Sequence, residues 1–196
     1  MATQKERSNA MRARLLEVGW RLFAERGFEA TSTSTLLAEA GVSKGALYHH
    51  FSSKQALFEA IFEHVAEQSI ARALRRPLDA STASQIDVLI EGALRWLTES
   101  RRPEFSRILL EDGPRVLGYQ RARDLEAKYS LGLMVRGLER AAQAGEIDLP
   151  DLELAAKLVN AALAEAALVS LQKRPRPTRA TIDETMRRLI HGLGCK

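Results

Sequence analysis

The chain has 196 residues, of which 45% are hydrophobic and 28% charged, and it carries a formal net charge of +4. This length allows one or two domains with a substantial core, and the composition is that of an ordinary soluble globular protein. The single cysteine, Cys195, excludes an intrachain disulfide and is typical of a reducing compartment. No apolar run reaches the ~20 residues of a membrane span, and the polar start has no signal-peptide core, so we expect a cytoplasmic protein with no membrane partner.

Positive charge is concentrated at the N-terminal end. Residues 1–55 hold eight Lys or Arg against five Asp or Glu, a net of +3, which leaves about +1 for the other 141 residues. A basic end on a nearly neutral chain favours binding to a polyanion, although a basic protein can show such a bias by chance.

The first helix is predicted to end near residue 27. Leu16, Trp20 and Phe23 recur at the spacing of one helix face. Gly27 is expected to stop the helix as a left-handed cap, and Phe28 is then placed to pack back on Phe23.

Two short helices are predicted next. Ser32 or Thr33 can cap a helix that runs through Ala40, and after a glycine turn Ser43 can cap a second helix that ends near Phe51. Two short helices joined by a tight turn with glycine are typical of a helix-turn-helix unit.

Helices are predicted along the rest of the chain as well. Ser52 and Gln55 have the capping-box spacing at the start of a helix over about 54–73. Asp151 can cap a later helix. The further helices are expected at about 86–100, 104–111, 121–144, 152–172 and 182–193, with breaks at 75–84, 112–118 and 173–181. No segment alternates with period two, so the predicted fold class is all-α.

The stretch from Ser43 to Phe51 has an inner and an outer face. Leu47 and Phe51 lie four apart and are expected to anchor the helix to the core. The outward set is Lys44, Gly45, Ala46, Tyr48 and His49. Small residues let a helix approach DNA closely, while lysine, tyrosine and histidine can bond to phosphates or base edges.

Other chemistry is poorly supported by the same residues. His49 and His50 face about 100° apart on a helix and have no third ligand near in sequence, which argues against a metal pair. No G-x-x-x-x-G-K-[ST] motif is present, nor any Ser-His-Asp set or Glu-x-x-His pair. We therefore expect no metal, no cofactor, no catalytic residue and no enzymatic activity.

The run "FAERGFEATSTSTLLAEAGVSKGALYHHFSSKQALFEAI", residues 23–61, closely resembles the DNA-binding domain of TetR-type (tetracycline-repressor-like) transcriptional regulators. The resemblance covers roughly residues 10–65 and departs from the family at Thr35, where an acidic residue is frequent. It implies a three-helix DNA-binding head over residues 1–55 and a ligand-binding, dimer-forming helical body over residues 56–196, connected by the helix at 54–73. With Ser43, whose backbone N–H suits a phosphate, the predicted DNA-binding residues are Ser32, Thr33, Ser43, Lys44, Gly45, Ala46, Tyr48, His49, His50 and Lys54.

The resemblance also implies roles for the body helices. The last two long helices are expected to pair between subunits, with burial in an intrachain core as the alternative. The predicted interface residues are Ala155, Val159, Ala162, Ala166, Ile182, Met186, Leu189, Ile190 and Leu193. An effector cavity is expected among the others. Its candidate lining is Phe62, His64, Trp96, Phe105, Leu109, Arg115, Tyr129, Leu133, Met134, Asn160 and Glu165, although an aromatic in such a position is more often plain core. Glu165 stands in an alanine-rich run, where it can face solvent, an arginine or the ligand.

These expectations combine into one functional hypothesis. The chain is predicted to be a homodimeric regulator that binds an inverted repeat in double-stranded DNA, acts as a repressor and is released by a small lipophilic or aromatic effector. A helical ligand-binding or interaction module without DNA binding is the first alternative, and a helical-bundle enzyme is the second.

Overall fold

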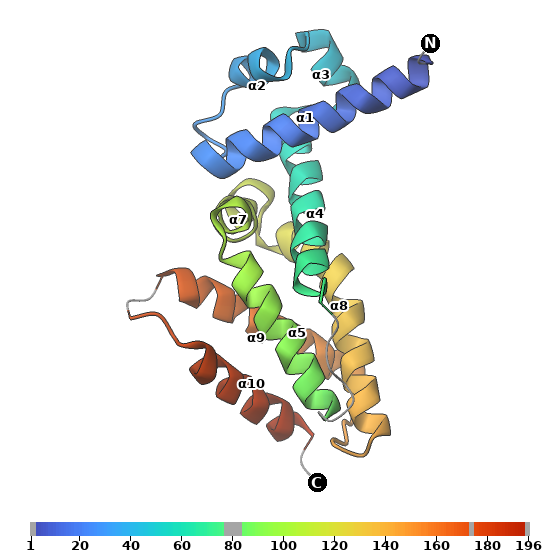
Figure 1. Ribbon diagram of the computed structural model, residues 1–196, viewed down its shortest axis with the longest axis vertical. Coiled ribbons are helices and arrows are strands. Elements are labelled where there is room, and N and C mark those ends of the chain that lie inside the picture. Colours follow the sequence, from blue (N-terminus) through green and yellow to red (C-terminus); the bar gives the residue numbers. More distant parts are fainter. Residues whose placement is uncertain (1–2, 77–83, 173–174, 195–196) are drawn as a thin grey trace. The chain divides into compact units, whose positions relative to one another are not determined.

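The computed structural model describes residues 3–76, 84–172 and 175–194, and within these ranges the chain is helical with no strand (Figure 1). The helices in chain order are α1 (Gln4–Arg26), α2 (Thr33–Ala40), α3 (Lys44–His50), α4 (Lys54–Ala73), α5 (Gln85–Ser100), α6 (Pro103–Ser106), the π-helix η1 (Arg107–Asp112), α7 (Gly113–Leu117), α8 (Tyr119–Gln143), α9 (Leu152–Gln172) and α10 (Arg179–Leu193). The all-α prediction is confirmed. Most of the predicted 75–84 linker and Cys195 lie outside the described residues.

The ends of α1 and α2 follow the sequence signals. The chain leaves α1 at Gly27 with φ +84°, although ψ 167° takes it out of the left-handed helical region that we expected. Phe28 does pack on Phe23, with ring centroids 5.6 Å apart. The Ser32 hydroxyl caps α2 by accepting from the Thr35 N–H at 3.0 Å.

Two local predictions were wrong. The cap of α4 is Ser53, not Ser52, because the Ser53 hydroxyl accepts from the Ala56 N–H at 3.0 Å. The break expected at 112–118 is helical instead, since η1 continues directly into α7 and the chain leaves that helix only at Gly118, where φ is +82°. Pro114 lies in the first turn of α7, where its missing N–H is tolerated, so the sequence "DGP" does not interrupt the helical path from η1 into α7.

The chain divides into two compact units. The first consists of residues 1–66 together with 103–123, and the second of residues 67–102 together with 124–196. The predicted functional boundary near residue 55 is a separate matter and stays a prediction.

Aromatic packing holds the first unit together. Phe23, Phe28 and Phe58 form a mutual cluster with centroid separations of 5.2–5.6 Å. Trp20 lies against Phe105, with centroids 6.0 Å apart, and its indole N–H donates to the carbonyl of Glu104 at 3.0 Å. The distant segment 103–123 is therefore part of the same core as the N-terminal helices.

Polar bonds attach that segment at further points. The Phe28 N–H donates to the Asp112 carboxylate at 2.8 Å. The Gln55 amide donates to the carbonyl of Val116 at 3.0 Å. Gly113 is buried, and a Cβ there would lie 2.3 Å from the ring of Phe62, so only glycine fits without a shift. The first unit thus combines the predicted DNA-binding helices with one segment of the predicted body.

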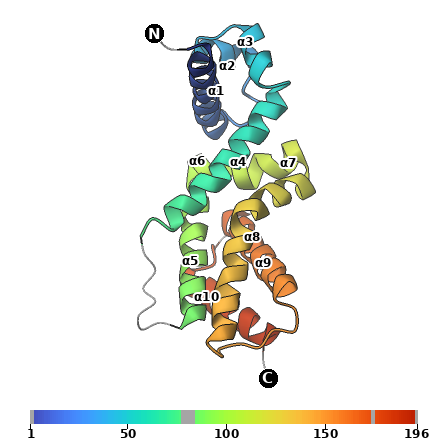
Figure 2. The same cartoon turned by 90° about the vertical axis from the view of Figure 1, so that its right-hand side faces the viewer.

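The second unit is built from α5, α8, α9 and α10, with α10 against α5 and α9 (Figure 2). Glu146, between α8 and α9, accepts from the N–H groups of Gln85 and Ile86 at the start of α5, at 2.7 and 3.0 Å. Asp87 in the same turn accepts from Arg187 of α10. These bonds satisfy the free amides of α5 and tie it to the C-terminal helix.

One helix corrects the expectation about apolar runs. The helix α9 is long and apolar enough to span a membrane, with a mean hydropathy of 1.6 over its best window. A core helix of a soluble protein passes the same test. One face of α9, which includes Ala156, Val159, Leu163 and Ala167, is buried against the rest of the second unit.

Candidate nucleic-acid interface

The helix α3 has one face anchored in the core and an opposite face exposed to solvent. Leu47 is fully buried and Phe51 is 5% exposed, so the two anchor residues lie in the core as predicted. On the opposite side, Tyr48 is 43% exposed and His49 is exposed. A Cβ added at Gly45 would meet no atom closer than 4.0 Å, so this face is open where close approach to a duplex is needed.

Hydroxyl groups cap the two short helices beside this face. The Ser43 hydroxyl accepts from the Ala46 N–H at 3.2 Å and caps α3, as predicted. The Ser32 hydroxyl is 2.7 Å from that of Ser34 and 2.9 Å from that of Thr35. Thr33, the other predicted contact at this helix start, is half-buried. The capping hydroxyls lie at the surface, where each can still donate to a phosphate oxygen.

The cations of α1 and α3 have different roles. Arg14 donates to the carbonyl of Ala40 at the end of α2, and Arg21 pairs with Glu39 of α2 at 2.9 Å. These two arginines hold α2 on α1, a role that the sequence analysis missed. Lys44 is exposed and has no ion-pair partner among the described residues. It is therefore available for an external anion.

Lys54 lies in a different environment from Lys44. Its ammonium donates to the carbonyls of Phe28 and Thr31 at 3.0 and 3.1 Å and lies 4.0 Å from the Phe28 ring centroid. Two of its three donors are thus used within the first unit. The predicted contact between Lys54 and DNA remains a prediction, and it has to share this ammonium with a structural role.

The two histidines face each other edge to face, with ring centroids 5.1 Å apart. His49 is exposed and His50 is half-buried. Partial burial, with smaller contributions from His49 and Arg12, lowers the pKa of His50 below its usual value. Among the described residues, no three or more His, Cys, Asp or Glu side chains gather in a way that could hold a metal ion.

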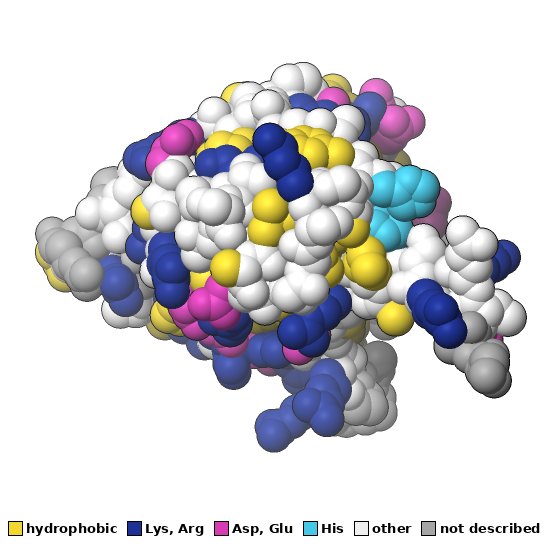
Figure 3. All heavy atoms as spheres, turned by 90° about the horizontal axis from the view of Figure 1, so that it is seen from above, with side chains coloured by type: hydrophobic (Ala, Val, Ile, Leu, Met, Phe, Trp, Pro, Cys, Tyr) yellow, Lys and Arg dark blue, Asp and Glu magenta, His cyan; other side chains and the backbone are white. Residues whose placement is uncertain are grey.

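Figure 3 looks onto the side of the first unit that carries α2 and α3. Lysine and arginine side chains are scattered over this view among polar and backbone atoms, and histidine lies toward one side. The few acidic groups visible lie mostly near its margins. This distribution suits an extended, regularly charged anion such as the DNA backbone.

The candidate effector residues are divided between the two units. In the first unit, Phe62, Phe105 and Leu109 are buried core residues, and His64 lies edge to face on Trp20. In the second unit Met134 is buried, and the half-buried candidates are Trp96, Tyr129, Leu133 and Asn160. The indole N–H of Trp96 donates to the Ser69 hydroxyl at 3.2 Å. The predicted cavity stays a prediction.

Two of the candidate polar anchors are exposed. Arg115 lies at the surface of α7, and Glu165 lies on the exposed side of α9. Of the three possibilities for Glu165, namely solvent, an arginine or the ligand, the single chain shows the first, because the residue is exposed to solvent. Neither residue lies in an enclosed lining within its own unit.

The predicted dimer residues need a correction. Ala155, Val159, Ile182, Met186 and Ile190 are each at most 5% exposed and belong to the core of the second unit. They pack α9 and α10 within one chain, so they are unavailable to a partner. Ala162, Ala166, Leu189 and Leu193 are less deeply buried, and part of each remains accessible.

A second apolar face of α9 was missed. Leu154 is 52% exposed and Leu158 is 46% exposed, and they lie one turn apart. Ala161 follows on the same side, with the exposed Glu165 one turn further. Their helical spacing was visible in the sequence. An apolar helix with two such faces gives no sequence signal for which face turns inward, because both read as hydrophobic.

Comparison with known proteins agrees with this geometry. Residues 15–61 match the family described as bacterial regulatory proteins of the tetR family, and residues 86–193 match the tetracyclin repressor-like C-terminal domain. The chain belongs to the TetR family. The second match alone covers more than half of the chain, including the body, which the sequence analysis had assigned only by helix number and length.

Individual TetR-family relatives cover different shares of the chain. The transcriptional regulator UidR of Escherichia coli K12 is 30% identical over 100 residues, which are 51% of this chain and 50% of that protein. The repressor KstR2 of Mycobacterium tuberculosis is 36% identical over 81 residues, 41% of this chain and 40% of that protein. The alignments thus span about half the length of these curated relatives or less.

A solved structure matches the whole chain. The TetR-family transcriptional regulator from Pectobacterium atrosepticum superposes with a TM-score of 0.79 at 27% identity, covering 100% of this chain and 99% of that one. These relatives are transcriptional regulators and not enzymes.

Proposed function

We propose that this TetR-family chain is a DNA-binding transcriptional repressor that acts as a homodimer on an inverted repeat and is released by a small lipophilic or aromatic effector. The observation that carries the proposal is the outer face of α3. That face exposes Lys44, Gly45, Tyr48 and His49 on a helix held by buried Leu47. A short helix with small residues near its start, and with donors beyond them, fits the major groove.

The exposed apolar face of α9 supports the homodimer. Leu154 and Leu158 are large, about half exposed and one turn apart, and an apolar surface of this kind can serve as an interaction site. A second copy that pairs α9 face to face would cover it. Two heads brought together in this way would read two half-sites about one helical turn of DNA apart.

The first unit supports a route from effector to DNA. Asp112 and Val116 lie in the segment 103–123, and they bond to Phe28 and Gln55 beside the DNA-binding helices. An effector that displaces this segment would therefore displace the head with it. The effector weakens DNA binding only as far as it binds the released conformation better than the DNA-bound one.

Footprinting tests the proposal on the DNA that flanks the gene of this protein. Protection of an inverted repeat is expected, with stoichiometry of one dimer per repeat. Absence of any protected inverted repeat at every salt concentration would reject the proposal. We place the protein in the cytoplasm, where that DNA lies, without a membrane partner.

A further inference from the structure

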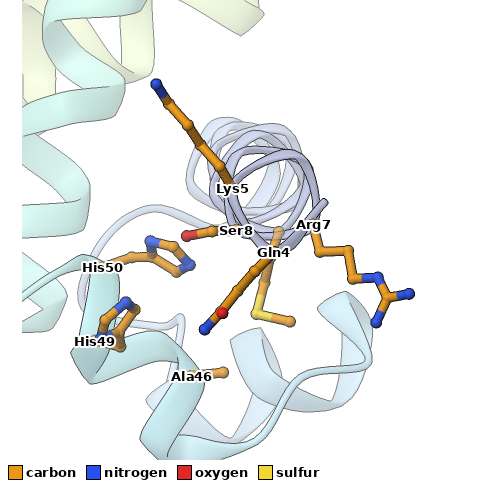
Figure 4. Close-up of a pocket in the computed structure, with 8 residues that line it drawn as sticks. Gln4, Lys5, Arg7, Ser8, Ala46, His49 and His50 are labelled. Carbon is orange, nitrogen blue, oxygen red and sulfur yellow. The ribbon is translucent and has the colours of Figure 1, made fainter. Parts of the chain in front are cut away.

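A groove of about 650 Å³ lies between the start of α1 and the end of α3 in the first unit (Figure 4). Its lining residues are Gln4, Lys5, Arg7, Ser8, Met11, Ala46, His49 and His50. In the close-up, Gln4 and Ser8 lie across from the two imidazoles, while Lys5 and Arg7 extend outward on opposite sides of α1. The groove combines neutral donors inside with two cations at its rim.

The groove adjoins the outer face of α3. Ala46, His49 and His50 line it, and the same three residues belong to the predicted DNA contacts. A duplex that lies on α3 would therefore pass beside the first turns of α1. The N-terminal residues that form the opposite wall were not among the predicted contacts.

The charge of the groove is suited to an anion. Lys5 and Arg7 are exposed and have no acidic partner among the described residues. The acidic residue beside them, Glu6, accepts from the Thr3 N–H as part of the helix cap. Arg12, which faces the ring of Phe51, contributes a further positive charge near His50. Within the described part of the chain, the groove lining itself contains no carboxylate.

We propose that this groove and its rim bind backbone phosphates of the DNA next to the bases contacted by α3, with Ser8 in the groove and Lys5 and Arg7 on either side of α1 as additional DNA-binding residues. This inference rests on the proposed DNA-binding function and extends its footprint. Cationic and hydroxyl side chains are the usual phosphate ligands in protein–DNA complexes, and they fix the position of the protein on the duplex without reading bases.

His50 makes the contact depend on pH. Partial burial, with the positive neighbours His49 and Arg12, keeps the pKa of His50 low in the free protein. A phosphate in the groove would stabilise the imidazolium and raise that pKa, so DNA binding takes up a proton. Affinity for DNA is then expected to increase as the pH falls through the range near 6.5 in which histidine titrates.

Salt dependence of DNA binding by the full chain tests the proposal. The probe is the duplex protected in footprinting, and the variant is Lys5→Ala with Arg7→Ala. The slope of log K against log salt should become shallower by about 0.9 for each phosphate that the variant no longer neutralises. The control is Arg136→Ala with Arg140→Ala, two exposed cations on α8 of the second unit, which removes the same charge and should leave the slope unchanged.

The outcomes separate this inference from the function on which it rests. Failure of the unmodified protein to bind any duplex specifically rejects the proposed function. Specific binding with the same slope for the groove variant and the control overturns the groove proposal alone. A second measurement uses His50→Gln, which should bind the same duplex with less gain in affinity between pH 8 and pH 6 than the unmodified chain. An equal gain also overturns the proposal.

A third arm distinguishes DNA phosphate from free phosphate. Inorganic phosphate is titrated while the imidazole signals of His49 and His50 are followed by NMR. The proposal is supported if inorganic phosphate competes with the duplex for the unmodified chain and this competition is lost in the variant with Lys5→Ala and Arg7→Ala. Saturation by inorganic phosphate with no effect on duplex binding shows a free-anion site and overturns it.

Discussion

At the scale of single residues, Lys44 and Lys54 differ in environment, although both belong to one helix-turn-helix region. Lys44 is exposed without an acidic partner among the described residues, whereas Lys54 donates to two carbonyls. We expect Lys44→Ala to weaken DNA binding by about 1–3 kcal/mol with no change in thermal stability. We expect Lys54→Ala to lower the free energy of unfolding by about 1–3 kcal/mol, because two carbonyls lose their donor.

Gel shifts together with thermal denaturation separate the two effects. Lys54→Arg is a useful additional variant, since it keeps the charge but changes the donor geometry. A variant of Lys54 that folds with full stability and binds DNA weakly would show that the structural bonds matter less than the phosphate contact.

Asp87 gives a pH-dependent contribution to stability. Hydrogen bonds from Arg187, and then from Ser84, lower the pKa of Asp87 in the folded chain. A group with a lowered folded pKa stabilises the fold above its unfolded pKa of about 3.9, and this contribution is lost as the pH falls below that value through the folded one. The difference in Tm between the unmodified chain and Asp87→Asn should therefore shrink as the pH falls from about 5 to about 3.

The magnitude of that difference is modest because the Asp87 side chain is 41% exposed and solvent screens the pair. Glu184→Gln, which breaks an exposed pair with Arg188 on the same helix as Arg187, controls for the loss of a surface carboxylate. A difference in Tm for Asp87→Asn that stays constant over this pH range would contradict the assigned role.

At the scale of elements, helix caps can be tested one hydroxyl at a time. Ser53 caps α4 through the Ala56 amide, and Ser52 beside it is exposed. Ser53→Ala should cost about 1 kcal/mol of unfolding free energy, while Ser52→Ala should change it by less than about 0.5 kcal/mol. Chemical denaturation measures both, and equal effects would mean that the cap moves between the two serines.

Those two serines also show what sequence could predict at this scale. The caps at Ser43 and Asp151 were predicted because each is one polar side chain before a helix pattern, whereas Ser32 was predicted only as one of two candidates with Thr33. The cap of α4 was placed one residue early, since two adjacent serines each satisfy the rule and only the backbone geometry chooses. The π-helix η1 was not predicted, because one extra residue in a turn leaves no periodic signal in the sequence.

At the scale of the whole molecule, the accessible side of α9 is the proposed dimer face. Leu158→Lys should convert the homodimer to a folded monomer, because it places a charge in the face that a second copy would cover. Sedimentation and circular dichroism would show a smaller particle with unchanged helix content, and specific DNA binding should fall with the loss of the second head. Glu139→Lys, on the exposed side of α8, is the matched control. A dimeric Leu158→Lys variant would place the interface elsewhere.

The fold class and the outward-facing residues of α3 could be predicted because they depend on local patterns. Leu47 and Phe51 must point inward, which leaves Lys44, Gly45, Tyr48 and His49 exposed. The exposed apolar face of α9 could not be predicted in the same way. Val159 and Leu158 are adjacent and equally apolar, and only the packing of α5 and α10 decides that Val159 is buried. The predicted effector residues depend on tertiary arrangement even more strongly.

The hydrogen bond between the Phe28 amide and Asp112 has a consequence for experiments. An amide proton held by a carboxylate from a segment 84 residues away exchanges with deuterium only when that bond opens. Its exchange rate therefore reports how often η1 detaches from the N-terminal helices. By the proposed route, an effector that displaces this segment would change the exchange rate of the Phe28 amide. A compound library could therefore be screened by this signal without knowledge of the DNA sequence or of the regulated genes.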